Sequence, residues 1–341
     1  MPPLSLVSGA VRSDRSRRTS TTVGDINHIA RVVLMCLTVD ILRYALTLEH
    51  LENAFYRDGL ANFTQADFTA AGWYYLYENL QDISAHEAAH VEFLTAGLQA
   101  AGVAPVQECE YAFGVTTVDQ FIATASILEG VGVSAYLGAA KQIANKAYLT
   151  AAGSILTVEA RHSSWLRAAL AKSPFPQPYD NPLSPNGVYT LASGFIVSCP
   201  EDNPTIPLRS FPGLTVTTTG AITSGRTIDV QTSEYVLALA NAKVHLAAAF
   251  ITANGPVWAN MTESGDGMNF QVTVPEGVYG QSYLLFSNCN ETVSDETVVA
   301  GPALVEISKA AGGQAFTAQV ASFTNTTLGA NATFTRRDIN V

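Results

Sequence analysis

The sequence is poor in basic residues. Lysine and arginine together number 18, against 29 aspartates and glutamates, which gives a formal net charge of -11 at pH 7. Binding to nucleic acid through its phosphates requires a positively charged surface. The one basic cluster, at Arg12, Arg15, Arg17 and Arg18, lies in a Ser/Thr-rich stretch that we interpret as part of a flexible tail over residues 1–24. We therefore expect no nucleic acid among the partners of this chain.

Several motifs of other functional classes are also missing. The most apolar stretch of the first helical region, Val32 to Val39, is too short to cross a bilayer, so we expect no membrane span. The N-terminus has no basic region followed by a clean cleavage site, so it does not show a signal peptide. There is no Gly-rich phosphate loop and no Ser/His/Asp order.

Cysteine is scarce, and its spacing matches neither a CxxC redox motif nor a zinc finger. We predict a disulfide between Cys109 and Cys199, because it would fasten a proline-rich segment to the helical region. Cys36 and Cys289 would then be free, and a Cys199–Cys289 link is the alternative.

Five sequons for N-glycosylation point towards an oxidising compartment. They begin at Asn62, Asn260, Asn290, Asn325 and Asn331. We accordingly expect a secreted glycoprotein, located extracellularly or in a cell wall.

The composition divides the chain into a helical and a β-rich part, an α+β multidomain organisation. Residues 25–171 are rich in Ala and Leu with helical periodicity, whereas residues 205–310 alternate Thr and Val with Gly/Pro punctuation. Residues 172–204 are rich in proline and are expected to wrap over a surface. Residues 311–341 are expected to form a C-terminal tail or additional strands.

In the first part we predict four long helices at 25–58, 71–101, 117–145 and 147–171. Gly59, Gly102 and the Thr116/Thr117 pair supply the stop and start signals. The longer connection after Gly102 suits a crossover between helix pairs, which would give a four-helix bundle with ferritin-like connectivity. In the second part we predict a small antiparallel β-sandwich. Its expected strands are Leu214 to Thr219, Thr227 to Gln231, Val244 to Ile251, Asn269 to Val274 and Ser282 to Ser287.

Acidic and histidine residues interrupt the apolar stripe of each predicted helix. Each stripe advances by three or four residues, which places its members on one buried face. Glu87 and His90 form one Glu-x-x-His motif, and Glu159 and His162 form another. A single inward glutamate precedes each motif, Glu52 in the first helix and Glu129 in the third.

Four buried carboxylates require compensating positive charge, and these stripes contain no Lys or Arg. We therefore predict that two metal ions bind to the set Glu52, Glu87, His90, Glu129, Glu159 and His162. Mixed Glu and His ligation suits iron or manganese and does not choose between them.

Four further residues are candidates for a supporting role. Glu49 lies about 60° further round its helix and competes with Glu52 as a ligand. His86, Tyr56 and Tyr136 are candidates for groups next to the ligands. We expect His50, in contrast, to point away from the core into solvent.

Three stretches resemble a known family, namely Ala45 to Tyr56, Glu129 to Ala140 and Phe195 to Pro200. They look like secreted fungal ferritin-like proteins described as stress-response or late sexual development proteins, which are similar to plant desiccation-related proteins. The resemblance covers about residues 37–300. It implies a ferritin-like bundle with a β-rich C-terminal extension.

Two functions remain open at this point. One is an oxidoreductase whose two iron or manganese ions act on oxygen or peroxide, in stress or development. The other is a non-enzymatic structural or interaction protein of the cell surface or wall, with a structural or vestigial metal site. The oligomeric state is open as well, and a homo-oligomer is one option.

Overall fold

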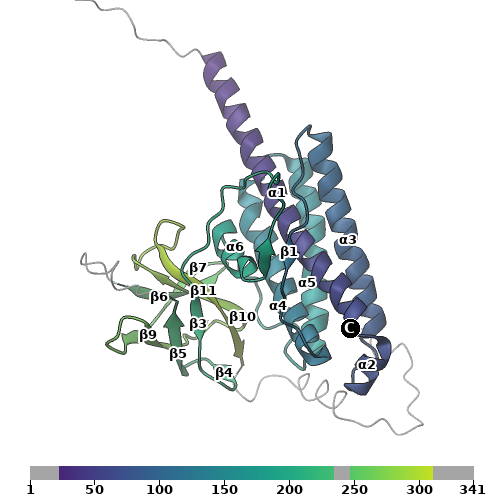
Figure 1. Cartoon of the computed structure of the whole chain (residues 1–341). Coiled ribbons are helices and arrows are strands. Elements are labelled where there is room, and N and C mark those ends of the chain that lie inside the picture. The colour runs from purple at the N-terminus through teal and green to yellow at the C-terminus, as the bar shows by residue number, and fades with distance from the viewer. Residues whose placement is uncertain (1–22, 234–245, 310–341) are drawn as a thin grey trace, which may run out of the picture.

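The computed structural model describes residues 23–233 and 246–309, with side chains from Thr38 onward. A helical part is followed by a part rich in β-strands (Figure 1), which confirms the predicted mixture of α and β structure. The expected tail, the C-terminal stretch after 310 and the Cys36 side chain lie outside the described residues.

Four long helices make up most of the first part. They are α1 (Val23–Asn62), α3 (Tyr77–Ala100), α4 (Val118–Ala139) and α5 (Lys146–Ala169), with the short α2 (Gln65–Ala70) between the first two. Helices α1 and α3 pack as one pair and α4 and α5 as another. Residues 101–117 connect the two pairs.

Local signals fix most helix ends. Thr117 caps α4 by accepting a hydrogen bond from the Gln120 amide at 3.2 Å, and Gly102 follows α3 with a φ of 73°. Helix α4 ends earlier than predicted, because the 3-10 turn η1 (Ala140–Gln142) follows it. The predicted stop at Gly59 is wrong. Helix α1 continues through it to Asn62, and a Cβ at Gly59 would lie 2.1 Å from the Phe121 ring.

The proline-rich segment packs on the helices and contains α6 (Pro185–Ser193) and β2 (Ile196–Ser198). Strand β2 pairs with β1 (Glu110–Tyr111) in the connection between the helix pairs. A disulfide joins Cys109 to Cys199 directly beside this ladder, and Cys289 is free. The segment is thus held to the connection both covalently and by hydrogen bonds.

The second part contains two sheets that enclose one apolar core. The strand order is β4-β11-β10-β6-β7 in the first sheet and β3-β5-β9-β8 in the second. The strands are β3 (Leu214–Val216), β4 (Ile222–Thr223), β5 (Thr227–Thr232), β6 (Ala247–Thr252), β7 (Gly255–Ala259), β8 (Met261–Glu263), β9 (Asn269–Thr273), β10 (Gly280–Ser287) and β11 (Val298–Ser308).

The pairing in these sheets is not wholly antiparallel, which corrects the prediction. Strand β4 runs parallel to β11, with Ile222 opposite Ile307. It comprises only two residues, too few for a residue pattern to reveal, and it extends the sheet at one edge.

Helix α4 contacts the β-rich part through small residues spaced four apart. Gly130 and Ser134 both meet Tyr283 of β10, whose hydroxyl lies 3.0 Å from the Gly130 carbonyl and 2.9 Å from Ser134 Oγ. A Cβ at Gly138 would collide with the Leu183 carbonyl of the proline-rich segment. A helix with one small-residue face therefore lets the backbone of other elements approach closely.

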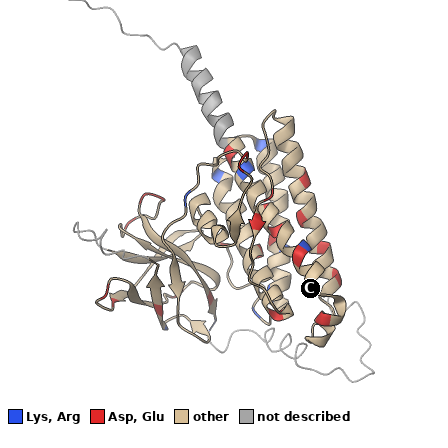
Figure 2. Cartoon of the chain, viewed as in Figure 1, with Lys and Arg blue, Asp and Glu red and all other residues tan. Residues whose placement is uncertain are grey.

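Helix α4 is also the most apolar helix. By length and composition the stretch Val118–Gln142 could cross a membrane, but 72% of its most apolar window is buried inside the protein. Its apolar character thus follows from its central place in the core. In Figure 2 the Asp and Glu residues lie on helices and loops alike, with fewer Lys and Arg residues among them.

Candidate metal centre

Seven ionisable residues from the four long helices meet in the middle of the helical part. Helix α1 contributes two glutamates, α4 one glutamate, and α3 and α5 one Glu-x-x-His motif each. All seven are buried, with at most 9% of any residue exposed. They are Glu49, Glu52, Glu87, His90, Glu129, Glu159 and His162.

The ligand atoms of six of these residues form two groups. Glu49, Glu87, His90 and Glu159 make the first group, and in each group the ligand atoms lie within 4.8 Å of one another. The second group consists of Glu87, Glu129, Glu159 and His162. Glu87 of α3 and Glu159 of α5 therefore belong to both groups and link them.

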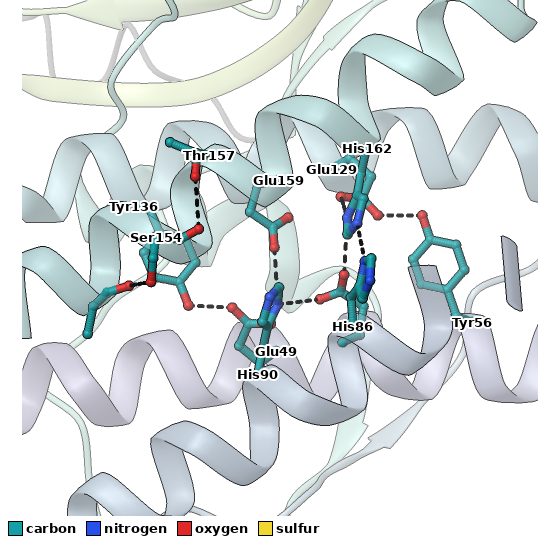
Figure 3. A network of polar contacts seen from close by, with 12 residues as sticks. Glu49, Tyr56, His86, His90, Glu129, Tyr136, Ser154, Thr157, Glu159 and His162 are labelled. Atoms are coloured by element: carbon teal, nitrogen blue, oxygen red, sulfur yellow. Dashed lines mark hydrogen bonds and ion pairs between the residues drawn. The ribbon is translucent and has the colours of Figure 1, made fainter. Parts of the chain in front are cut away.

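The two histidines turn the same ring nitrogen towards the glutamates (Figure 3). His90 Nδ1 lies 3.1 Å from Glu49 Oε2 and 3.2 Å from Glu87 Oε2. His162 Nδ1 lies 3.1 Å from Glu129 Oε2. Each motif thus directs its carboxylate and its imidazole to one point, as the i,i+3 spacing predicts.

The structure brings together five of the six predicted ligands and places the sixth beside them. Glu52 is buried but belongs to neither group, and the α1 carboxylate in the first group is that of Glu49. The reason lies in the surroundings of α1. Other elements cover α1 on nearly all sides, so both glutamates are buried and burial alone does not separate them.

His50 shows the same effect and corrects the expectation that it points into solvent. It is 9% exposed instead of solvated, and its Nε2 lies 3.1 Å from the Val106 carbonyl. Val106 belongs to the connection between the helix pairs, which covers the outer face of α1. A pattern within one helix cannot show that a distant loop packs against its outer side.

Two tyrosines hold the outer oxygens of the glutamates in a reciprocal arrangement. The Tyr56 hydroxyl of α1 donates to Glu129 Oε1 of α4 at 2.5 Å. The Tyr136 hydroxyl of α4 donates to Glu49 Oε1 of α1. Each tyrosine therefore orients a carboxylate on the opposite helix.

His86 stands at the outer edge of the second group. Its Nδ1 lies 3.0 Å from His162 Nε2, and the two rings stack at a centroid distance of 5.2 Å. His162 would bind metal through Nδ1, so His86 contacts the ring nitrogen that would not bind metal. A group in this position sets the orientation of the imidazole ring.

The buried charges perturb one another strongly. Burial raises the pKa of Glu49 to about 7, although a hydrogen bond with His90 opposes the rise. Burial and then the charge of Glu159 raise the pKa of Glu52 well above its usual value. Burial lowers the pKa of His162, but hydrogen bonds with Glu129 and Glu87 outweigh it and raise the value to about 9. Without metal, this site therefore retains protons at neutral pH.

The donor set fits two metal ions by its charge and by its unused oxygens. Glu159 Oε2 is buried and has neither a hydrogen bond nor an ion pair in the described structure, whereas Glu159 Oε1 and Glu87 Oε1 face His90 and His162 Nδ1 at 3.4 and 3.3 Å. Such atoms are costly unless a cation or proton meets them. The four glutamates of the two groups would balance two divalent ions, with both histidines neutral. Oxygen and imidazole ligands suit iron and manganese.

Comparison with known proteins supports this description of the helical part. Residues 37–172 match the family described as the ferritin-like domain. The chain is also similar to Protein rds1 of Schizosaccharomyces pombe (strain 972 / ATCC 24843), with 28% identity over 174 residues. That alignment covers 51% of this chain and 42% of the relative, so this chain matches less than half of that protein's length. The helical part is thus ferritin-like and contains a buried acidic and histidine cluster that could bind metal.

Proposed function

We propose that the protein is a ferritin-like two-metal carboxylate protein that binds iron or manganese and reacts slowly with oxygen or peroxide. The observation that carries the proposal is the pair of four-ligand groups that share Glu87 and Glu159. Glu49 and His90 would complete one site, and Glu129 and His162 the other. When bound, two adjacent ions of variable valence would exchange electrons with a small oxidant.

The protein's own residues would set the conditions for this chemistry. Tyr56 and Tyr136 fix the orientation of two carboxylates through their hydroxyls. Leu80 and Ile122 are buried in the core that surrounds the site and exclude bulk water, which restricts entry to small molecules. An iron store would instead need a route for hydrated ions, so we propose slow turnover and not storage.

We further propose that the helical part is a four-helix bundle and the β-rich part a sandwich, acting in a secreted protein linked to stress or development. The Cys109–Cys199 disulfide supports an oxidising compartment. The sequon residues Asn62, Asn260 and Asn290 are exposed and accessible to glycosylation, while Asn325 and Asn331 lie outside the described residues. Mass analysis of protein from its natural host would detect the glycans.

The test of the metal site compares two double variants. Elemental analysis of the unaltered protein should give close to two equivalents of iron or manganese. Glu87→Ala with Glu159→Ala removes both shared ligands and should abolish binding of both ions. Glu78→Ala with Glu92→Ala, at exposed positions of α3, removes the same number of carboxylates and should leave metal content unchanged. Equal metal content in both double variants would refute the proposed site.

A second experiment tests the reaction. Protein loaded with iron or manganese is mixed with oxygen or hydrogen peroxide, and absorbance and loss of peroxide are followed. We expect slow spectral change and slow consumption of oxidant. A metal that is redox-silent with both oxidants would support the alternative, a non-enzymatic surface or wall protein with a structural metal site.

A further inference from the structure

A cavity of about 190 Å³ lies between the ferritin-like helices and the β-rich part. Its walls come from α1, α4, α6 and β11, and aliphatic side chains make up most of them. Among the described residues that line it, Glu52 is the one ionisable group. Leu191 and Ala192 of α6 and Leu304 of β11 form the wall opposite the helices. The cavity therefore exists only because the proline-rich segment and the β-rich part pack on the helices.

The inner end of the cavity reaches the metal centre through Gly132. This glycine lines the cavity, and a Cβ on it would lie 2.8 Å from Glu159 Oε2 and 3.0 Å from Glu52 Oε1. Any larger residue would fill the space in front of these two carboxylates. Glu159 is shared by both ligand groups, and its Oε2 accepts no hydrogen bond. The absence of a side chain at Gly132 thus connects the apolar cavity to the shared ligand.

Glu52 is buried beside the candidate metal centre but lies outside both ligand groups. It forms no hydrogen bond or ion pair with another described residue. A buried polar group of this kind is destabilising unless a ligand or proton meets it. Its place in the lining makes it available to a molecule inside the cavity.

Size and chemistry define what the cavity could hold. An apolar protein cavity of about 150 Å³ binds benzene, so a single ring or an aliphatic body of similar size fits the present one. A charged ligand would lose its hydration in these aliphatic walls. A hydroxyl group can both donate and accept, so it can pair with the Glu52 carboxyl in either protonation state.

We propose that this cavity binds a small uncharged organic molecule with a hydroxyl group, of the size of phenol, with its hydroxyl on Glu52 beside the metal centre. The position next to a reactive centre rests on the proposed two-metal function. The binding itself requires only the cavity, so the two proposals can fail separately.

The experiment measures binding of phenol and of benzene to the full-length protein by calorimetry, with and without metal. We expect phenol to bind in both states. Glu52→Leu should weaken phenol binding about tenfold and leave benzene binding equal or tighter, because one hydrogen bond is lost. Ala192→Leu fills the cavity from the α6 side, away from the ligands, and should weaken both at least tenfold. Ala100→Leu, at the exposed end of α3, is the control for added bulk.

The position beside the metal has its own readout. Protein loaded with paramagnetic manganese should broaden the NMR lines of bound phenol, and zinc-loaded protein should not. Phenol that fails to bind in either state, or that binds equally to the Ala192→Leu variant, would overturn the inference and leave the metal analysis untouched. Phenol binding that Ala192→Leu weakens, in a protein that takes up no metal, would support the cavity site while the two-metal function fails.

Discussion

Tyr56 and Tyr136 hydrogen-bond to glutamates of the metal centre and a third buried tyrosine does not, which allows a matched test. Their hydroxyls donate to Glu129 and Glu49, whereas the buried Tyr44 hydroxyl has no hydrogen-bond partner in the described structure. Groups that orient metal ligands typically contribute about 10- to 100-fold to metal affinity. Tyr56→Phe and Tyr136→Phe should each weaken metal binding by about that factor, measured by competition with a chelator. Tyr44→Phe should leave affinity unchanged, and an equal loss in all three variants would contradict the orienting role.

The pH dependence of stability should differ between metal-free and metal-loaded protein. Burial raises the pKa of Glu49 from 4.5 to about 7. Between these values the folded chain keeps a proton that the unfolded chain releases, so the free energy of unfolding falls as pH rises. The raised pKa of His162, about 9, extends the same loss above its ordinary value of 6.5. Bound metal replaces these protons, so metal affinity should rise with pH.

Thermal unfolding at about pH 5.5 and about pH 8.5 tests both signs. The metal-free protein should unfold at a lower temperature at the higher pH, and the gain in midpoint from metal should be larger there. Glu49→Gln removes one titrating group. In the metal-free protein it should therefore reduce the fall of the unfolding temperature with pH, up to about pH 7. If the unfolding temperature of the metal-free protein rose with pH, the result would contradict the raised pKa values of Glu49 and His162.

How far a sequence predicts such a site depends on the surroundings of each helix. In α3 one face is buried, and Leu80, Glu87 and His90 follow its three- and four-residue steps, so periodicity alone identifies Glu87 and His90. Helix α1 is covered on both sides by segments distant in sequence. Its glutamates are therefore both buried, and the contacts of Glu49 with His90 and Tyr136, across 41 and 87 residues, distinguish them.

At the scale of elements, alanine substitutions at two helix glycines are expected to change stability in opposite directions. A Cβ at Gly59 would overlap the Phe121 ring of α4, whereas a Cβ at Gly97 of α3 would meet nothing within 4 Å. Gly59→Ala should destabilise the protein by about 1–3 kcal/mol through overpacking. Gly97→Ala should stabilise it by up to about 1 kcal/mol, since alanine favours a helix. Urea unfolding would measure both, and a stable Gly59→Ala variant would show that α1 and α4 do not need this close contact.

The strands were predicted less completely than the helices. Strand β11 spans 11 residues and lies between β4 and β10, yet its Gly301-Pro302 pair is typical of a turn. In the structure the register with β10 shifts at this pair, so the strand continues past it. Strands β4 and β8 have two and three residues, too few for an alternating pattern. Their positions depend on pairing with distant strands, which local sequence does not encode.

At the scale of the whole molecule, the Cys109–Cys199 disulfide closes a loop over a sequence separation of 90 residues. Such links typically stabilise a protein by about 2–5 kcal/mol, largely by restricting the unfolded chain. Cys109→Ser with Cys199→Ser should lower the unfolding temperature, whereas Cys289→Ser should not. Metal content should survive in both, because every ligand lies on one of the four long helices and none lies on β1, β2 or the residues next to the disulfide. Loss of metal in the double variant would mean that the link also holds the site.

The reciprocal tyrosine contacts imply an approximate twofold relation between the two helix pairs. Tyr56 follows Glu49 by seven residues and Tyr136 follows Glu129 by seven. Each tyrosine hydroxyl donates a hydrogen bond to the glutamate of the other helix pair. Two positions break the relation: Gly132 of α4 stands where α1 has Glu52, and His86 precedes Glu87 where Val158 precedes Glu159. Only the half of the site with His162 therefore has a second imidazole beside it. Two ions bound to these similar but unequal ligand groups would be inequivalent. The two positions would therefore be occupied in sequence, and the two ions would differ in how readily each is oxidised.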